Sequence, residues 1–489
     1  MSKSALPPLT FGVELEMAIA CIRREYDKDP DPTETRNLRF HPTDDDIANY
    51  NAKQAILGLE PDDSDPNDRA VVYDIVTTIN CKKHIQALLS KAGLPVGSDL
   101  HDEYAEGDFS VWEIVEDISI NDPEQPNPYY WAKIEIRSPA YFFNRGALEA
   151  VQQVCDLLAT NYCVNTSNNC GLHVHVGKQD TGFDDQSVRN LMSFVWAFEP
   201  QLNSILGQRR FNIVYCVSPR ESSRYAMKYM QKYGMRPKPI TGVQHFQEDQ
   251  DLSWVAEQSA EYKGDLKFNS VNFKGLHDRA KGDIYGKPTI EFRQHEGTID
   301  AERVTNWIST VVGIVDFVCH AYPHDLHSLL LVSTQETWET LGDGTDESYE
   351  ESDGPVLAEG NFTAVHLFEW MGLHGPANFY RDKMTVIEKT DSGSQPGWIL
   401  WPHEHDKSLS EEERTGMDLR RELFESMRQL KLNEHSVLKF DQSSPFWPPH
   451  EALEDDIDRD TDESSEASSD GGLPSEESET RYEESPGDK

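Results

Sequence analysis

Four short stretches of the chain alternate apolar with ionisable residues: Gly12-Val-Glu-Leu-Glu16, Lys133-Ile-Glu-Ile-Arg137, Gly171-Leu-His-Val-His-Val-Gly177 and Thr289-Ile-Glu-Phe-Arg-Gln-His-Glu-Gly-Thr298. Successive side chains of a β-strand point to opposite faces, so the ionisable residues of each stretch are predicted to share one face. Such groups are costly to bury unless they bind a ligand or one another. If the strands share one sheet, we therefore predict a core on one face and an active-site floor on the other. The floor would carry Glu14, Glu16, Glu135, Arg137, His173, His175, Glu291, Arg293 and His295.

The carboxylates of this predicted floor suit a hard divalent cation. Mg²⁺ prefers carboxylate oxygens and usually keeps waters and substrate phosphates as its other ligands; Glu14, Glu16 and Glu135 would supply the carboxylates. Arg293 offers a planar fork for phosphate or carboxylate, and the two histidines of the third stretch could bind metal, phosphate or an acyl group. A metal and cations around a phosphate are expected where charge stabilisation drives phosphoryl transfer. The chain has no GxxxxGK[ST] or GxGxxG motif, which disfavours a P-loop NTPase or a Rossmann enzyme.

Plainer interpretations of the same residues remain open. The glutamates of the first stretch also fit a solvated strand edge, and the charged pair of the fourth fits cross-strand ion pairs. Arg137 also fits a structural partner for Glu135. A different enzyme would place zinc between His173, His175 and Glu135 and act as a metal-dependent hydrolase without a nucleotide.

Three of the motifs, taken in order, resemble a known family. Phe11-Gly-Val-Glu-Leu-Glu16, Cys170-Gly-Leu-His-Val-His-Val-Gly177 and the fourth stretch are similar to the putative amidoligase family that is common in fungi. That family belongs to the glutamine synthetase and γ-glutamylcysteine ligase superfamily of carboxylate–amine ligases. The resemblance spans residues 10–320. It implies an α+β fold in which an antiparallel sheet, backed by helices, holds ATP and Mg²⁺ or Mn²⁺ on a concave face.

The resemblance also implies a reaction. A substrate carboxylate, on a small molecule or a peptide, attacks the γ-phosphate of ATP, and an amine then displaces phosphate from the acyl phosphate to give an amide. A third, non-enzymatic alternative is a catalytically degenerate member that binds a partner through its acidic surface.

Residue by residue, the resemblance assigns metal binding to Glu14 and Glu16 of the first strand and to Glu135 of a later strand. It assigns the same role to His173 of the HxH segment and to Glu291 of the closing strand. With Asn272 and Arg209, which are candidate substrate or phosphate contacts, the expected nucleotide-binding set is His173, Arg293, Asn272 and Arg209. The expected catalytic residues are Arg293, His175 and His295. Asp117 and Ser119 resemble the family's Asp-Gly-Ser, but Ile118 stands in place of the glycine.

Composition excludes several classes of function. The chain has 489 residues and a formal net charge of −42, and such a surface repels nucleic-acid backbones and anionic membranes. No run approaches the ~20 apolar residues of a membrane helix, and the N-terminal residues lack the apolar core of a signal peptide. Seven cysteines without a CxxC motif favour a reducing compartment, and Cys170 fits a small buried residue better than a nucleophile. We expect a cytoplasmic protein, with a nuclear location and a homo-oligomer left open.

The chain divides by composition into three parts. Residues 1–335 are predicted to form the glutamine synthetase-like catalytic domain, residues 336–450 a helical extension with an acidic loop, and residues 451–489 a disordered acidic tail. Within the first part we predict two insertions, at 27–69 and 217–265. Further predicted strands lie at 111–120 and 266–274, and further predicted helices at 80–92, 145–160, 184–206, 301–319, 362–372 and 409–430.

Overall fold

The computed structural model describes residues 9–22, 29, 31–40, 42–56, 66–97, 109–123, 129–166, 169–179, 182–206, 216–262, 266–283, 287–335 and 363–381. All of them belong to the first of two compact units, Met1–Phe440. The predictions for Arg209, for the helix at 409–430 and for the acidic tail at 451–489 lie outside the described residues.

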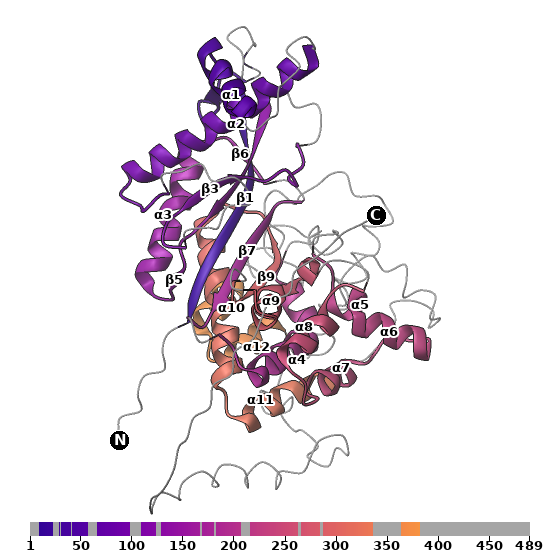
Figure 1. The fold of residues 1–489 in the computed structure, drawn as a ribbon. Coiled ribbons are helices and arrows are strands. Elements are labelled where there is room, and N and C mark those ends of the chain that lie inside the picture. Colours follow the sequence, from indigo (N-terminus) through magenta and orange to yellow (C-terminus); the bar gives the residue numbers. More distant parts are fainter. Residues whose placement is uncertain are drawn as a thin grey trace, which may run out of the picture. The chain divides into compact units, whose positions relative to one another are not determined.

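An open sheet of antiparallel neighbours is the centre of this unit. Its main strands follow the order β3 (Glu113–Glu116), β4 (Tyr130–Arg137), β1 (Thr10–Ile22), β7 (Gly171–Gly177), β9 (Thr289–Glu296) and β8 (Val271–Asn272). The two-residue strands β2 (Leu38–Arg39), β5 (Tyr141–Phe142) and β6 (Val164–Asn165) also pair with β1, β2 in parallel. The four alternating stretches are thus β4, β1, β7 and β9, side by side in the sheet (Figure 1). The prediction of an antiparallel sheet in a mixed α and β fold is confirmed.

Two strands are shorter than the sequence predicts. The predicted strand at 111–120 is reduced to β3 because the chain turns at Asp117: its carbonyl oxygen accepts from the Ile120 N–H at 3.3 Å and its Oδ1 accepts from the Ser119 N–H at 2.8 Å. The predicted strand at 266–274 is reduced to β8, which follows a 3-10 turn at Leu266–Phe268.

Helices with apolar stripes back the sheet. α3 (Arg145–Asn161), α4 (Asp185–Asn203) and α10 (Ala301–His320) lie where the sequence predicts them, and α10 lies against β7 and α3 (Figure 1). Each begins at a side chain that caps its free N–H groups; the Oδ1 of Asn144, for example, accepts from the Ala147 N–H at 3.0 Å. Trp307 of α10, Val174 of β7 and Phe292 of β9 are fully buried, so one face of the sheet forms the core.

The long helix α2 (Pro66–Lys91) and several short helices complete the described part of the fold. α1 (Asp44–Ile56) and the start of α2 occupy the predicted insertion at 27–69, so the helix predicted at 80–92 begins earlier, at Pro66. The predicted insertion at 217–265 is helical: α5 (Pro219–Ser222), α6 (Arg224–Tyr233), α7 (Pro239–Phe246) and α8 (Leu252–Ser259), with α7 and α8 packed on α4. Among the residues that the structure describes, the remaining α-helices are α9 (Lys274–Ala280), α11 (Pro323–Leu330), α12 (Ala364–Trp370) and a helical segment at 374–381. α12 confirms the helix predicted at 362–372.

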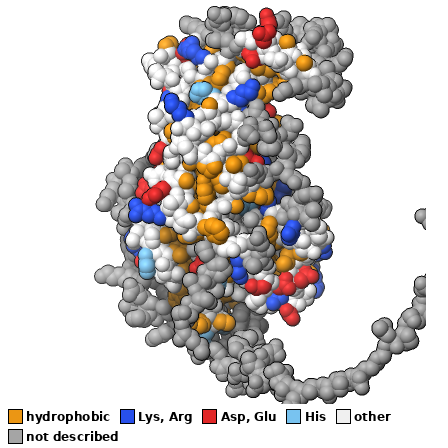
Figure 2. Space-filling model, turned by 60° about the vertical axis from the view of Figure 1, so that its left-hand side comes forward, with side chains coloured by type: hydrophobic (Ala, Val, Ile, Leu, Met, Phe, Trp, Pro, Cys, Tyr) orange, Lys and Arg blue, Asp and Glu red, His pale blue; other side chains and the backbone are white. Residues whose placement is uncertain are grey.

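The described part of the surface mixes charge signs. Figure 2 shows hydrophobic side chains along the middle of one face, with basic and acidic side chains interspersed around them. Among the described side chains on that face there is no concentrated basic patch. No helix within the described ranges is both long enough and apolar enough to cross a bilayer.

A buried guanidinium satisfies backbone carbonyls at a kink in α4, and a buried carboxylate lies beside it. Phe198 has non-helical dihedral angles (φ −116, ψ 19) and Pro200 has no N–H for the Trp196 carbonyl. Arg220 of α5 donates from Nε to the Trp196 carbonyl oxygen at 2.6 Å and from Nη2 to the Ala197 carbonyl oxygen at 2.8 Å. The Glu199 side chain accepts at Oε2 from the Ser218 hydroxyl at 3.0 Å. Burial raises the pKa of Glu199 to about 7, although the charge of Arg220 opposes this.

We expect Glu199→Gln to stabilise the protein at high pH only. The folded pKa lies above the ordinary value of 4.5, so the folded state binds the extra proton, and wild-type stability falls as pH rises from about 4.5 to about 7. The neutral glutamine escapes this loss, on the order of 1–3 kcal/mol at pH 8, and gains nothing at pH 4.5 or below. Urea denaturation of both proteins at the two pH values measures the difference. A gain that is equal at both pH values would contradict this assignment.

Candidate functional site

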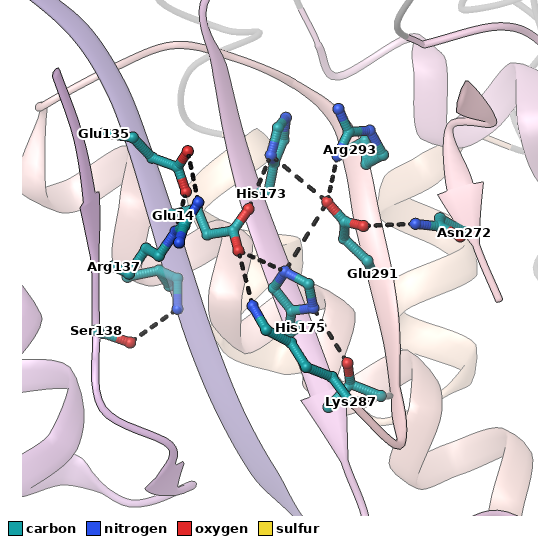
Figure 3. A network of polar contacts seen from close by, with 12 residues as sticks. Glu14, Glu135, Arg137, Ser138, His173, His175, Asn272, Lys287, Glu291 and Arg293 are labelled. Atoms are coloured by element: carbon teal, nitrogen blue, oxygen red, sulfur yellow. Dashed lines mark hydrogen bonds and ion pairs between the residues drawn. The ribbon is translucent and has the colours of Figure 1, made fainter. Parts of the chain in front are cut away.

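Strand pairing brings the predicted site residues onto one face of the sheet. Pairing runs from β4 across β1, β7 and β9 to β8, and directly paired residues point to the same face. The pairs are Glu16–Glu135, Glu14–Arg137, Glu14–His173, His175–Glu291 and Glu291–Asn272. Figure 3 shows Glu14, Glu135, Arg137, His173, His175, Asn272 and Glu291 of this set converging from neighbouring strands into one polar network. The predicted floor is therefore present, with Glu14 on the central strand β1.

Glu14 contacts three nitrogen-bearing side chains. Its Oε1 lies 3.0 Å from Nε2 of His175 and 3.3 Å from Nζ of Lys287, and its Oε2 lies 3.3 Å from Nδ1 of His173. Burial alone would raise the pKa of this carboxyl, but the charges of His175 and Lys287 and the histidine hydrogen bonds outweigh it. The pKa of Glu14 is held well below its usual range, so its side chain is a carboxylate at neutral pH.

Three carboxylates converge on one ring nitrogen. Nδ1 of His173 lies 3.3 Å from Oε2 of Glu14, 3.4 Å from Oε1 of Glu16 and 3.5 Å from Oε1 of Glu291. A single N–H donates well to only one of them at a time. The other oxygen of Glu16 accepts from the backbone N–H of Gly171 at 2.6 Å, which fixes the direction of this carboxylate. Three negative groups around one point favour a cation there.

Glu291 is held in its charged form by its neighbours. Its Oε1 forms an ion pair with Nη1 of Arg293, and its Oε2 accepts from Nδ2 of Asn272 at 2.6 Å. Burial raises the pKa of Glu291, but the charges of Arg293 and His175 outweigh burial and lower it to about 2. Asn272, predicted as a phosphate or substrate contact, thus lies in the network as an orienting partner of Glu291.

Glu135 and Arg137 form the edge of the network on β4. Arg137 donates from Nε to Oε1 of Glu135 at 2.6 Å and from Nη2 to Oε2 at 3.3 Å, so the guanidinium forms a bidentate ion pair with both carboxylate oxygens. Burial and the charge of Glu14 raise the pKa of Glu135 to about 7 in spite of Arg137. The ion pair that the structural interpretation of Arg137 expects with Glu135 is therefore present.

A subset of the network fits a divalent cation. Glu14, His175 and Glu291 can each offer one ligand atom, and these three atoms lie within 4.8 Å of one another. Carboxylate oxygens and an imidazole nitrogen are ligands that Mg²⁺, Mn²⁺ or Zn²⁺ accepts in proteins. Two of the three were predicted as metal ligands, whereas His175 was predicted as catalytic. The predicted ligands Glu16 and His173 adjoin this triad through the contacts at Nδ1 of His173.

His295 does not share the row of Glu291 and Arg293, and that prediction is wrong. Between the pairs Leu172–His295 and Val174–Phe292, one residue of β7 faces two residues of β9, which is a β-bulge. The extra residue turns His295 to the face of Leu172. There its Nδ1 lies 2.7 Å from the carbonyl oxygen of Glu296, and its ring lies 5.4 Å from that of Trp307 on α10. His295 is therefore a core histidine.

Three other residues singled out in the sequence are not among the hydrogen-bonded side chains of this network. Asp117 and Ser119 form the turn after β3. Cys170 is buried with Ala18, Ala20, Ile120 and Trp131, which supports the interpretation of a small buried cysteine.

Sequence reasoning missed Lys287 and the role of Thr289. The Oγ1 of Thr289 lies 3.1 Å from Nδ1 of His175, and Lys287 reaches Glu14. The available signal was the period of two: counting back from Arg293 and Glu291 along the strand leads to Thr289 and then to Lys287.

A glycine of α9 fixes the backbone that carries these two residues. A Cβ at Gly275 would lie 2.1 Å from the carbonyl oxygen of Lys287, and a backbone oxygen cannot rotate away as a side chain can. We expect Gly275→Ala to lower the free energy of unfolding by about 1–3 kcal/mol and to displace Lys287 and Thr289. Gly375→Ala is the matched control because it meets open space in the helical segment 374–381; it should change stability by less than about 0.5 kcal/mol. Equal effects in urea denaturation would contradict the contact.

An open antiparallel sheet that gathers carboxylates, imidazoles and arginines on one face has the make-up of an enzyme active site that handles charged groups. A family model described as "putative amidoligase enzyme" matches residues 7–315, a range that contains every strand of the sheet and every residue of the network. The chain belongs to this family, and its membership indicates an amide-bond-forming ligase. The search of curated proteins gives no match.

Proposed function

We propose that the protein is an ATP- and Mg²⁺-dependent carboxylate–amine ligase that acts through an acyl phosphate, as in the glutamine synthetase and γ-glutamylcysteine ligase superfamily. The observation that carries this proposal is that the carboxylates of Glu14, Glu16 and Glu291 converge around Nδ1 of His173, while Glu14 also contacts His175. The alternative of a solvated strand edge does not account for this arrangement, because it would leave the carboxylates in water. Burying several carboxylates together is costly unless they bind something. The family's amide-forming class supplies the reaction, and the network supplies the charge that phosphoryl transfer from ATP requires.

The residues of the network have distinct roles in this reaction. Glu14, His175 and Glu291 hold the divalent cation, which neutralises charge on the phosphate oxygens when bound. Asn272 and Thr289 orient two of these ligands through their own hydrogen bonds. Arg293 presents a guanidinium beside them for the transferred phosphate.

The two steps of the reaction balance as follows. An oxygen of the substrate carboxylate bonds to the γ-phosphorus of ATP while the bond from that phosphorus to ADP breaks. The amine nitrogen then bonds to the acyl carbon, the carbon–oxygen bond to phosphate breaks, and the amine loses a proton. We propose a small-molecule or peptide carboxylate and a small amine as the substrates.

Binding to wild-type protein tests the proposal before any substrate is known. We expect Mg²⁺ with a nonhydrolysable ATP analogue to raise the melting temperature, because a ligand at 100 times its Kd stabilises the folded state by about 2.7 kcal/mol. Incubation with ATP, Mg²⁺ and pooled amino acids and metabolites should then release phosphate and form new amide masses. Bound zinc without any response to nucleotide would favour the hydrolase instead. The structure gives that alternative less support, because Glu135 lies against Arg137 and not in the ligand triad.

A further inference from the structure

Lys287 lies at the rim of the network, in the residues just before β9. Its Nζ is 3.3 Å from Oε1 of Glu14 and 5.7 Å from the centre of the Phe109 ring, and its side chain is 40% exposed. The two arginines differ from it in their pairing. Arg137 and Arg293 each form an ion pair with the glutamate two residues earlier on the same strand, whereas Lys287 reaches across the sheet to β1.

The ion pair between Lys287 and Glu14 occupies a position that a metal needs. Oε1 of Glu14 accepts from Nε2 of His175 and from Nζ of Lys287 together, and Glu14, His175 and Glu291 are the three potential ligands of the cation. A divalent ion bound to Glu14 and His175 would repel the ammonium group from this oxygen. A partly exposed ion pair contributes little to stability, so its loss is tolerated.

We propose that Lys287 is a phosphate-binding residue of the site, which rests on Glu14 in the metal-free protein and contacts the terminal phosphate of the nucleotide once a divalent ion takes Glu14. The inference rests on the proposed function, because it assumes that ion and that nucleotide. A lysine suits this role because its ammonium is a point charge on a flexible stem with three donors. The Phe109 ring offers the displaced ammonium a favourable surface at the rim.

Two titrations should respond to this residue in opposite directions. In Lys287→Met, Mn²⁺ alone should bind at least about threefold more tightly than in wild type, because a competing positive charge is gone. With saturating Mg²⁺, a nonhydrolysable ATP analogue should bind roughly 10- to 100-fold more weakly, the effect of a lost charged hydrogen bond. ADP lacks the contacted phosphate and should bind almost as in wild type. Lys287→Arg should keep most of the affinity for the ATP analogue.

The control is Lys281→Met on an exposed lysine whose Nζ lies 4.0 Å from Oε1 of Glu257; it should leave both titrations unchanged. A structural role for Lys287 would weaken Mn²⁺ and nucleotide binding together, and that result would overturn the inference. So would equal losses for ADP and the ATP analogue, or Lys287→Met binding like wild type. If wild type binds neither Mn²⁺ nor nucleotide, both the proposed function and this inference fail. If wild type binds both and Lys287→Met binds them with the same affinities, only the inference fails.

Discussion

Glu14→Gln is expected to abolish metal-dependent activity while leaving the sheet folded. Glu14 is the side chain that joins both histidines and Lys287, and its depressed pKa keeps it charged at neutral pH. Glutamine has nearly the same shape and can still accept hydrogen bonds, but it brings no charge to a metal. Loss of several kcal/mol of charge stabilisation corresponds to a rate reduction of roughly 10²- to 10⁴-fold.

Four measurements separate this effect from a folding defect. Circular dichroism and urea denaturation should show a folded protein, Mn²⁺ titration should show affinity reduced at least about 100-fold, and the rise in melting temperature with Mg²⁺ and ATP analogue should disappear. Glu149→Gln is the matched control, because that exposed glutamate of α3 pairs only locally with Arg145 and should behave like wild type. If Glu14→Gln keeps wild-type Mn²⁺ affinity and activity, Glu14 is not a metal ligand.

The part of the site that could be predicted from sequence is the part that obeys a strand's period of two. The stretches 12–16 of β1, 133–137 of β4 and 171–177 of β7 alternate strictly, so the faces of Glu14, Glu135 and His173 followed from spacing alone, whereas the order of the strands in the sheet was not predicted. His295 shows the limit of this logic. A β-bulge shifts the period by one residue, and it depends on how two strands pair rather than on either sequence.

Other differences from the sequence prediction have related physical causes. Lys287 was missed because it lies two residues before the first residue of β9, Thr289, and the period of two was not extended beyond the strand; its side chain nevertheless reaches Glu14. The helices between 217 and 265 are too short for a clear 3.6-residue period, and packing stabilises them instead: α7 and α8 pack on α4, and α6 packs on α5 and α8. Their helical state was therefore not visible in local sequence.

Removing the Arg293 side chain should lower both the stability and the activity of the protein. A second substitution at Glu291 should restore the stability but not the activity. Arg293 is largely buried, with 14% of its side chain exposed, and it forms an ion pair with the buried Glu291. Arg293→Met leaves that carboxylate without its main compensating charge, and such a change typically costs about 3–5 kcal/mol. Glu291→Gln should cost less, because the charges of Glu16 and Glu14 still act on Arg293 and help to keep its pKa raised.

The double variant Glu291→Gln with Arg293→Met separates the two consequences. It removes the Glu291 carboxylate together with the main charge that compensates it, so we expect it to regain most of the stability that Arg293→Met loses, with a coupling energy of roughly 1–3 kcal/mol in urea denaturation. Activity should stay absent in all three variants, because the metal ligand or the phosphate contact is missing from each. The Glu135–Arg137 pair has the same spacing and serves as the control cycle; its coupling should be smaller because 27% of the Arg137 side chain is exposed. Additive stabilities would show that Glu291 and Arg293 are not an energetic unit, and an active double variant would show that this pair takes no part in the reaction.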